Sequence, residues 1–342
     1  MPLYKGTTEI AGSKLYKGTT EIENVYKGSS MVYQNNISFN SHFLIAGGGA
    51  NGGPDTYNYY NNTSENYDEL FYYAGGGGGG VRTSFAGATP VANGGGQSLD
   101  SQLAMLTNTA YAIIVGDNGT SVGGNSSVGS LVAVGGGGNC TAYYASQTMA
   151  SVPANGGGGG GYSVGYTGSG NLTYPRDGSG NYIAPTFVSG TYGFNGGAQN
   201  SYYYRTGGGG GAGSAATNNP ISIGSYQAMT AGGSGITSSI TGSSVAYGVG
   251  GNGFYANSSL TRPAVTTIGS GGHGGLTENY NKWGIGSYGM FQASKAGTDG
   301  CVILRFPNTR NYTASGSPTL TTDGSDKILQ WTTAGTYTIT FT

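Results

Sequence analysis

Four short apolar runs stand out along the chain, at residues 42–45, 110–115, 130–134 and 301–306. They are rich in β-branched and aromatic residues, and glycine or turn residues bound most of them. The run 110–115, for example, ends at the turn sequence Asp117-Asn118-Gly119. This pattern predicts a small core of short β-strands at the base of the glycine-rich region.

The first 36 residues contain a short internal repeat at positions 3–10, 15–22 and 25–32. Each copy has a β-favouring pair, a Lys-Gly turn and a second short strand ending in Ile or Val, which predicts a small hairpin or solenoid rung. Three such units bury little by themselves, so they either attach the chain to another protein or cap the following domain. The candidate attachment residues are Tyr4, Tyr16, Tyr26, Ile10, Ile22 and Val32.

Residues 37–307 hold most of the glycines, which arrive in separate blocks divided by long, dissimilar spacers. A flexible linker would spread its glycines more evenly, so the spacing indicates an ordered arrangement of glycine runs. The blocks lie at 47–53, 75–80, 94–96, 135–138, 156–161, 196–197, 207–213, 232–235, 248–253 and 269–275.

Buried glycine runs must still hydrogen-bond every backbone N–H and C=O group. An α-helix costs about 1 kcal/mol per glycine. Polyproline II geometry has three residues per turn and no internal hydrogen bonds, so its polar groups can pair only with closely packed neighbouring chains. Only glycine allows that approach on all sides, and we therefore expect layers of laterally bonded glycine runs supported by the flanking strands.

The last segment, 308–342, predicts two or three strands, clearest at 328–331 and 335–341. We therefore expect three parts: N-terminal β-repeats at 1–36, a glycine-rich domain at 37–307 and a C-terminal β-strand tail at 308–342. The expected fold is mainly β and irregular: a polyglycine II helical sandwich flanked by short β-strands, with almost no α-helix.

Composition supports an ordered, non-enzymatic chain. Of 342 residues, 71 are Gly, 28 are Tyr and only 8% are charged, while 36% are hydrophobic, which is too apolar for a typical disordered protein. With 13 basic and 14 acidic residues, the chain has no excess positive charge that would attract nucleic acid or an anionic membrane surface. No catalytic triad or carboxylate pair stands out, so we expect no enzyme activity.

Other candidate chemistry is sparse. The sequence of residues 47–52 satisfies GxGxxG, but a helix is not expected after it, so we predict no dinucleotide cofactor. The chain has two histidines and two cysteines without CxxC spacing, which predicts no metal site. The two cysteines are either two thiols or one disulfide. No run approaches a membrane span of about 20 apolar residues or a signal peptide, so we expect synthesis in a cytoplasm.

Tyrosines gather in the segments between glycine blocks, together with Ser, Gly and Asn. This composition is typical of binding loops, because the rigid amphipathic ring of tyrosine gives a large contact area at low entropy cost. The alternative is that the rings only pack against the glycine layers and one another. The candidate receptor-binding residues are Tyr57, Tyr59, Tyr60, Tyr67, Tyr143, Tyr144, Tyr202, Tyr203 and Tyr204.

Taken in order, the segments 42–49, 73–82, 133–139 and 297–305 resemble the glycine-rich domain family of bacteriophage tail and fibre proteins. The block arrangement is similar to polyglycine II tip adhesins of T-even-type phages. The resemblance implies a virion protein whose loops recognise a host surface glycan or outer-membrane protein, while residues 1–36 bind other tail or fibre proteins. The resemblance does not decide whether the protein is a monomer or a homotrimer.

Two other functions remain. A purely structural virion protein, such as a fibre shaft, collar or capsid decoration, would use the glycine layers only for stiffness. An ice-binding or cell-surface polyglycine protein would need a flat, regular face of Thr or small residues.

Overall fold

The computed structural model describes residues 36–53, 74–120, 122–138, 192–197, 207–216, 231–253, 264–274 and 295–342. Elsewhere it gives only the bounds and pairing of short strands. The fold is mainly β and irregular, as the sequence predicts, and the only helical segment among the described residues is a 3-10 turn at Gly94–Gly96. In these parts of the chain no helix is long and apolar enough to cross a membrane.

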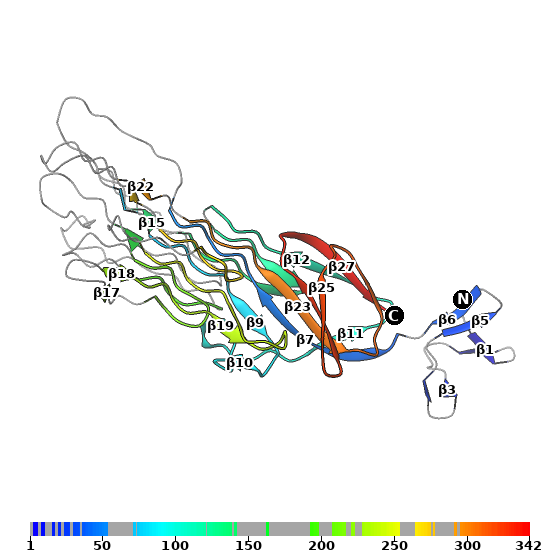
Figure 1. Cartoon of the computed structure of the whole chain (residues 1–342). Coiled ribbons are helices and arrows are strands. Elements are labelled where there is room, and N and C mark those ends of the chain that lie inside the picture. The colour runs from blue at the N-terminus through cyan, green and yellow to red at the C-terminus, as the bar shows by residue number, and fades with distance from the viewer. Residues whose placement is uncertain are drawn as a thin grey trace, which may run out of the picture.

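Two sheets form the body at one end of the molecule (Figure 1). The first sheet has six strands: β11 (Leu103–Leu106), β7 (Ser38–Ala46), β23 (Cys301–Pro307), β26 (Asp326–Trp331) and β25 (Thr319–Asp323), with β9 (Val81–Thr83) paired to β7. The second sheet has five strands: β14 (Leu131–Ala133), β13 (Ser126–Val128), β12 (Ala110–Val115), β27 (Gly335–Phe341) and β24 (Tyr312–Ala314). All four predicted apolar runs are strands here.

The two sheets enclose the larger of the two hydrophobic cores that the described residues form. Phe43 of β7 and Leu304 of β23 point from the six-stranded sheet toward Ile113 and Ile339 of the five-stranded sheet. All four side chains are fully buried. Side chains at every second position of β7 and β23 fill this core. Those at the intervening positions point to the opposite side of the six-stranded sheet.

That opposite side carries the second core. Leu44 and Ile303 there pack with Ile236 and Tyr247 of a third layer, a three-stranded sheet. Burial on both faces explains why 43–46 and 301–304 read as continuous apolar runs rather than alternating ones. The third layer consists of β10 (Ala88–Thr89), β19 (Ile236–Ser238) and β20 (Val245–Tyr247).

The C-terminal segment is not a tail. Strand β26 pairs with β23 along six residues, and β27 lies in the middle of the five-stranded sheet, between β12 and β24. The expected boundary after residue 307 therefore falls within the sandwich. The physical reason is that Leu329, Trp331 and Phe341 supply a share of the main core that no other strand replaces.

The N-terminal repeats form three two-stranded antiparallel hairpins, which confirms the hairpin interpretation. In the first, Lys5 pairs with Thr8 across a two-residue connection. The side chains of the candidate attachment residues lie outside the described part of the chain. The hairpins are β1 (Leu3–Lys5) with β2 (Thr8–Ile10), β3 (Tyr16–Lys17) with β4 (Thr20–Glu21), and β5 (Asn24–Lys27) with β6 (Ser30–Gln34).

Glycine runs continue from the sandwich strands and form a lattice with a period of three residues. In residues 75–80 every backbone N–H donates to a neighbouring run at 2.7–3.1 Å, and successive residues use different neighbours. Gly75 and Gly78 donate to Gly207 and Gly210, Gly76 and Gly79 to Gly272 and Gly269, and Gly77 and Gly80 to Gly137 and Val134. One neighbour is parallel and two are antiparallel. A three-residue period with purely lateral bonds is that of polyglycine II.

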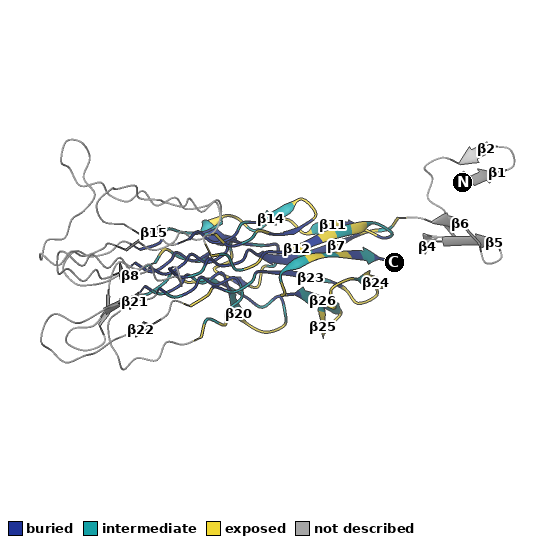
Figure 2. Cartoon of the chain, turned by 90° about the horizontal axis from the view of Figure 1, so that it is seen from above, coloured by how far each residue is buried: buried dark blue, intermediate teal, exposed yellow. Residues whose placement is uncertain are grey.

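The lattice leaves no room for side chains between runs. A Cβ atom added to Gly209 or to Gly271 would collide with the backbone carbonyl of Gly76, and one added to Gly76 would collide with the carbonyl of Ala50. In Figure 2 the runs accordingly continue the buried interior of the sandwich. Glycine is required here for close approach, because a displaced carbonyl would lose its own lateral bond.

Membership of the lattice differs from the predicted blocks in two ways. The block 94–96 is a turn instead, because Gly95 and Gly96 have φ of 69° and 74°, opposite in sign to polyproline II. Two runs with fewer glycines join the lattice, residues 116–124 and 295–300, which accept bonds from Gly48 and Gly49 respectively. The block 156–161 lies outside the described residues.

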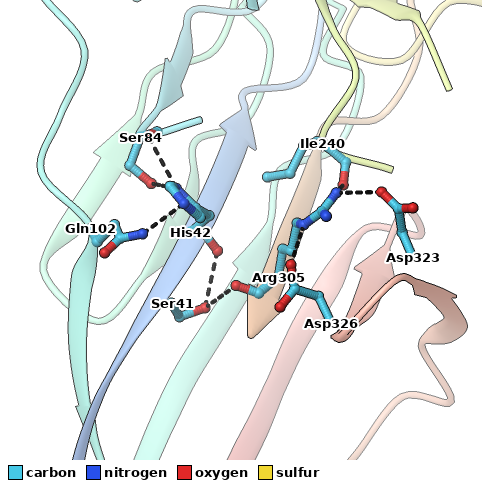
Figure 3. A network of polar contacts seen from close by, with 8 residues as sticks. All are labelled: Ser41, His42, Ser84, Gln102, Ile240, Arg305, Asp323 and Asp326. Atoms are coloured by element: carbon cyan, nitrogen blue, oxygen red, sulfur yellow. Dashed lines mark hydrogen bonds and ion pairs between the residues drawn. The ribbon is translucent and has the colours of Figure 1, made fainter. Parts of the chain in front are cut away.

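A polar network ties the third layer and the β25–β26 hairpin to β23 (Figure 3). The Arg305 guanidinium donates to Asp326 and Asp323, each at 2.8 Å, and to the carbonyl oxygen of Ile240 at 3.3 Å. Burial lowers the pKa of Arg305, but its bonds to Asp326 and Asp323 outweigh this and raise it above the ordinary value. The network therefore holds a permanent charge in a structural role.

His42, which pairs in register with Arg305, is held by neutral partners. Its Nδ1 lies 3.1 Å from the carbonyl oxygen of Ser84, and its Nε2 lies 2.6 Å from Nε2 of Gln102. In the tautomer that fits both contacts, Nδ1–H donates to Ser84 and Nε2 accepts from Gln102. The ring is thus occupied by protein contacts on both nitrogens.

Candidate functional site

Three chain segments leave the lattice and return to it through stems closed by one backbone hydrogen bond each. Gly53 donates to Ala74 at 3.3 Å, Gly197 to Gly208 at 2.7 Å, and Lys295 to His273 at 2.9 Å. These bonds close the segments 54–73, 198–207 and 274–294. Each of these segments therefore starts and ends at a fixed pair of lattice residues.

The three stems are neighbours. Gly52 donates to the carbonyl of Lys295 at 3.2 Å, which joins the first stem to the third. Gly75 donates to the carbonyl of Gly207 at 3.1 Å, which joins the first stem to the second. The chain after residue 138 leaves from the same region, because Gly77 donates to Gly137 at 2.8 Å. The lattice thus gathers four departure points that are far apart in the sequence.

Small sheets extend this end of the molecule. Strand β21 (Leu276–Thr277) pairs with both β8 (Phe71–Tyr72) and β22 (Phe291–Gln292), so the first and third segments share one three-stranded sheet. Two further pairs are β15 (Cys140–Thr141) with β16 (Tyr162–Ser163), and β17 (Pro220–Ser222) with β18 (Ala228–Thr230). Figure 1 shows β15, β17, β18 and β22 at the end opposite the C-terminus.

Side-chain amides complete the lattice near the stems. The Asn51 side-chain oxygen accepts from the backbone N–H of Gly297 at 2.8 Å, and the Asn118 amide donates to the carbonyl of Gly297 at 3.1 Å. The Asn252 side-chain oxygen accepts from Gly232 at 2.9 Å, while its own backbone N–H donates to Nδ1 of His273 at 3.0 Å. Asn51, Asn252 and His273 accept hydrogen bonds in place of backbone carbonyls, and Asn118 donates one in place of a backbone N–H, so the stems stay fixed without a full set of glycines.

All nine candidate receptor-binding tyrosines lie outside the described residues. What the structure fixes is where their segments depart. Tyr57 to Tyr67 belong to the segment between Gly53 and Ala74, and Tyr202 to Tyr204 belong to the one between Gly197 and Gly208. Tyr143 and Tyr144 come one residue after the end of β15. The three segments therefore leave the described lattice at neighbouring positions.

Sequence reasoning missed a further segment of the same kind. Residues 274–294 contain Tyr280, Trp283 and Tyr288, and their stem adjoins that of the first segment. The same enrichment in aromatic, Gly, Ser and Asn residues could have identified it. These three side chains also lie outside the described residues.

The glycine-rich sequence at residues 47–52 is unsuited to holding a phosphate. The backbone N–H groups of Gly47, Gly48 and Gly49 donate to Gly80, Gly124 and Thr298 at 2.9–3.0 Å. A dinucleotide fingerprint needs such groups free and aimed at the ligand from a helix N-terminus. In the described ranges, no group of three or more His, Cys, Asp or Glu side chains is arranged to hold a metal ion.

Cys301 is a buried thiol in the second core. Burial raises its pKa to about 12, so the thiol is protonated and unreactive at neutral pH. Cys140 lies in a strand whose side chains the structure does not describe. Because the chain has only two cysteines, a free Cys301 excludes the predicted alternative of a disulfide between them.

No family model, curated protein or solved structure matches this chain.

Proposed function

We propose that the chain is a virion adhesin of a bacterial virus, carried on the tail or a tail fibre. Its tyrosine-rich segments would bind a host surface receptor, either a glycan or an outer-membrane protein. The observation that carries the proposal is the set of neighbouring stems. Three segments rich in aromatic residues depart side by side from one end of a rigid lattice.

The lattice suits this role physically. Binding loses affinity when loops must be ordered at the moment of contact, and each immobilised side chain costs about 0.5–1.5 kcal/mol. Stems fixed by lateral backbone bonds limit that cost to the segments themselves. They also allow loop sequences to vary, since the lattice bonds that close the stems are made by residues outside the loops.

Adsorption measurements test the proposal. Purified full-length protein should bind host cells and compete with virus adsorption. Replacing Tyr202, Tyr203 and Tyr204 together with Ser should reduce that competition without changing the melting temperature. Leu320→Ser on the exposed strand β25 is the matched surface control and should compete like wild type. Protein that neither binds host cells nor affects adsorption would leave the structural virion role in place of the adhesin.

The hairpins β1 to β6 are the proposed attachment segment. An isolated two-stranded hairpin is marginally stable in water, so three of them gain most by pairing with a partner. A virus whose protein lacks residues 1–34 should assemble particles without it, while the purified truncated protein keeps its melting transition. Normal incorporation of the truncated protein would disprove the attachment role and favour a cap.

A further inference from the structure

A single stretch of chain joins the two ends of the described domain. Strand β7 begins at Ser38, shortly after the N-terminal hairpins, and ends at Ala46. The glycine run 47–53 follows it directly, and the next residue opens the first tyrosine-rich segment, residues 54–73. Figure 2 shows β7 and the glycine lattice beyond it extending in one direction. Residues 37–53, the axial segment, therefore connect the N-terminal hairpins to the first stem by a direct covalent path.

Lateral bonds hold the axial segment along its whole length. At its start, the N–H of Ile37 donates to Oγ1 of Thr107 at 2.9 Å, and the N–H of Thr107 donates to the carbonyl of Ile37 at 3.0 Å. Strand β7 pairs with β11 and β9 on one edge and with β23 on the other. Every N–H from Gly47 to Gly53 then donates to a neighbouring run at 2.7–3.3 Å. The axial segment thus lies inside both the sheet and the lattice.

The axial segment is already close to its full length. A β-strand rises about 3.2–3.4 Å per residue and a polyproline II run about 3.1 Å, whereas a chain pulled straight spans at most about 3.6 Å per residue. Over the 17 residues from 37 to 53 the difference amounts to about 5–10 Å. Tension between the two ends is therefore carried by covalent bonds, because breaking the lateral bonds would release almost no length.

Tension at the third stem reaches the N-terminal hairpins by a different path. From Lys295 the chain continues into β23, which lies antiparallel to β7. The two are joined sideways by the bonds of Gly49 to Thr298 at 2.9 Å and of Gly52 to Lys295 at 3.2 Å, and by the β7–β23 ladder. Pulling Lys295 away from the hairpins therefore slides one strand along the other and loads these hydrogen bonds in shear.

We infer that the axial segment is a tension-bearing tether between the N-terminal hairpins and residues 54–73. The first tyrosine-rich segment is then the one receptor contact, among the three closed stems, through which load passes along a short covalent path. Residues 198–207 and 274–294 add contact area, but their load crosses lateral bonds. This use of the tether rests on the proposed adhesin function, whereas the mechanical property belongs to the described residues alone.

Single-molecule pulling on the full-length protein tests the tether. One handle is attached to the N-terminus, and the other to a new cysteine, either Thr63→Cys in the first segment or Lys295→Cys at the third stem. Lys295 is exposed and accepts a bond from Gly52, so the two handles load neighbouring stems. Both proteins also carry Cys140→Ser. Buried Cys301 then reports unfolding, because a maleimide reaches it only when β23 is exposed.

The two handle positions should give different results at the same force. At a force that unfolds the Lys295→Cys protein in a long step, the Thr63→Cys protein should label Cys301 at least about tenfold more slowly, since forced unfolding follows the unfolding rate under load. Equal labelling of Cys301 in the two geometries would overturn the tether. If Lys295→Cys fails to fold, Ala296→Cys, which is also exposed, replaces it.

Detachment under flow tests the use of the tether on a virus. Replacing the four candidate tyrosines of residues 54–73 with Ser should make viruses detach from host cells at lower flow than replacing the three at 202–204. Equal detachment of the two viruses, with the tether confirmed by pulling, would contradict a load-bearing role of the first segment. Adsorption that depends on neither set would refute the adhesin, while the pulling result, obtained without a receptor, would still stand.

Discussion

The ring of Phe39 packs edge-on against the ring of Phe341, with centroids 4.9 Å apart and planes 74° from parallel. One residue enters the glycine-rich domain and the other is the penultimate residue of the chain. Phe306, from the strand that follows the last glycine run, makes a second edge-on contact with Phe341 at 4.9 Å. The sandwich that supports the lattice is therefore closed by the chain's last strand.

This closure predicts a large effect of Phe341→Ala. The side chain is fully buried, and Phe-to-Ala changes in such sites cost about 3–5 kcal/mol. We expect denaturant unfolding to show a loss of that size. Leu320→Ala, at a residue with 49% of its surface exposed, is the control and should change stability by about 0.5 kcal/mol or less. Equal stability of the two variants would mean that the C-terminal strand is dispensable.

The buried thiol of Cys301 predicts a loss of stability in alkali. An unfolded cysteine ionises near pH 8.5, at about its reference pKa, whereas the folded thiol has a pKa of about 12. Between these values the unfolded state has released a proton that the folded state keeps, so unfolding becomes easier as pH rises. The slope contributed by this group approaches about 1.4 kcal/mol per pH unit.

Cys301→Ala removes that contribution while leaving Tyr247, whose pKa burial also raises, in place. Unfolding free energies measured between pH 9 and 11 should therefore fall more steeply for wild type than for the variant. Parallel curves would show that the thiol ionises equally in both states.

Gly209→Val tests the close approach of the runs. Its side chain would meet the backbone of Gly76, and since the colliding atoms are backbone no rotamer change can relieve them. Overpacking costs about 1–3 kcal/mol even when side chains can shift, so we expect little soluble protein and no cooperative melting transition.

Gly129→Ala is the matched control for a lost glycine. It lies in the β13–β14 turn with φ of 55°, and no atom lies within 4 Å of an added Cβ. Backbone strain alone should cost about 1–2 kcal/mol there. A cooperative transition for Gly209→Val close to that of Gly129→Ala would argue against tightly packed runs.

The sequence predicts the strands of the six-stranded sheet well, because burial on both faces requires continuous apolar stretches that are visible in the sequence. The continuous apolar stretches in β7 and β23 follow from cores on each side of the six-stranded sheet. The alternation of Tyr337, Ile339 and Phe341 likewise predicts a strand. It does not reveal that β27 lies between β12 and β24, because pairing partners are set by long-range packing.

Lattice membership is only partly predictable from glycine content. Residues 295–300 belong to the lattice although two of its six residues are glycine, because Lys295 and Ala296 are exposed and their side chains need no room between runs. The block 94–96 is pure glycine but turns, held beside Thr83 by the side chain of Asn93. Local packing, rather than composition, decides each case.

The candidate site was predictable as a set of segments but not as a place. Tyrosine enrichment identifies three segments, and the same pattern holds for the missed one at 274–294. Their common departure region follows from lattice register, for example the bonds of Gly52 to Lys295 and of Gly75 to Gly207. No local pattern in the sequence encodes that register.

Amide hydrogen exchange over residues 74–80 is the most direct measurement of the lattice. Here each N–H from Gly75 to Gly80 is bonded to a neighbouring run, so exchange should require the same opening that exposes β23. We expect protection comparable to that of residues 302–306 in the native protein. Exchange of these glycine amides as fast as in an unstructured glycine-rich peptide would contradict the lattice and the rigid stems built on it.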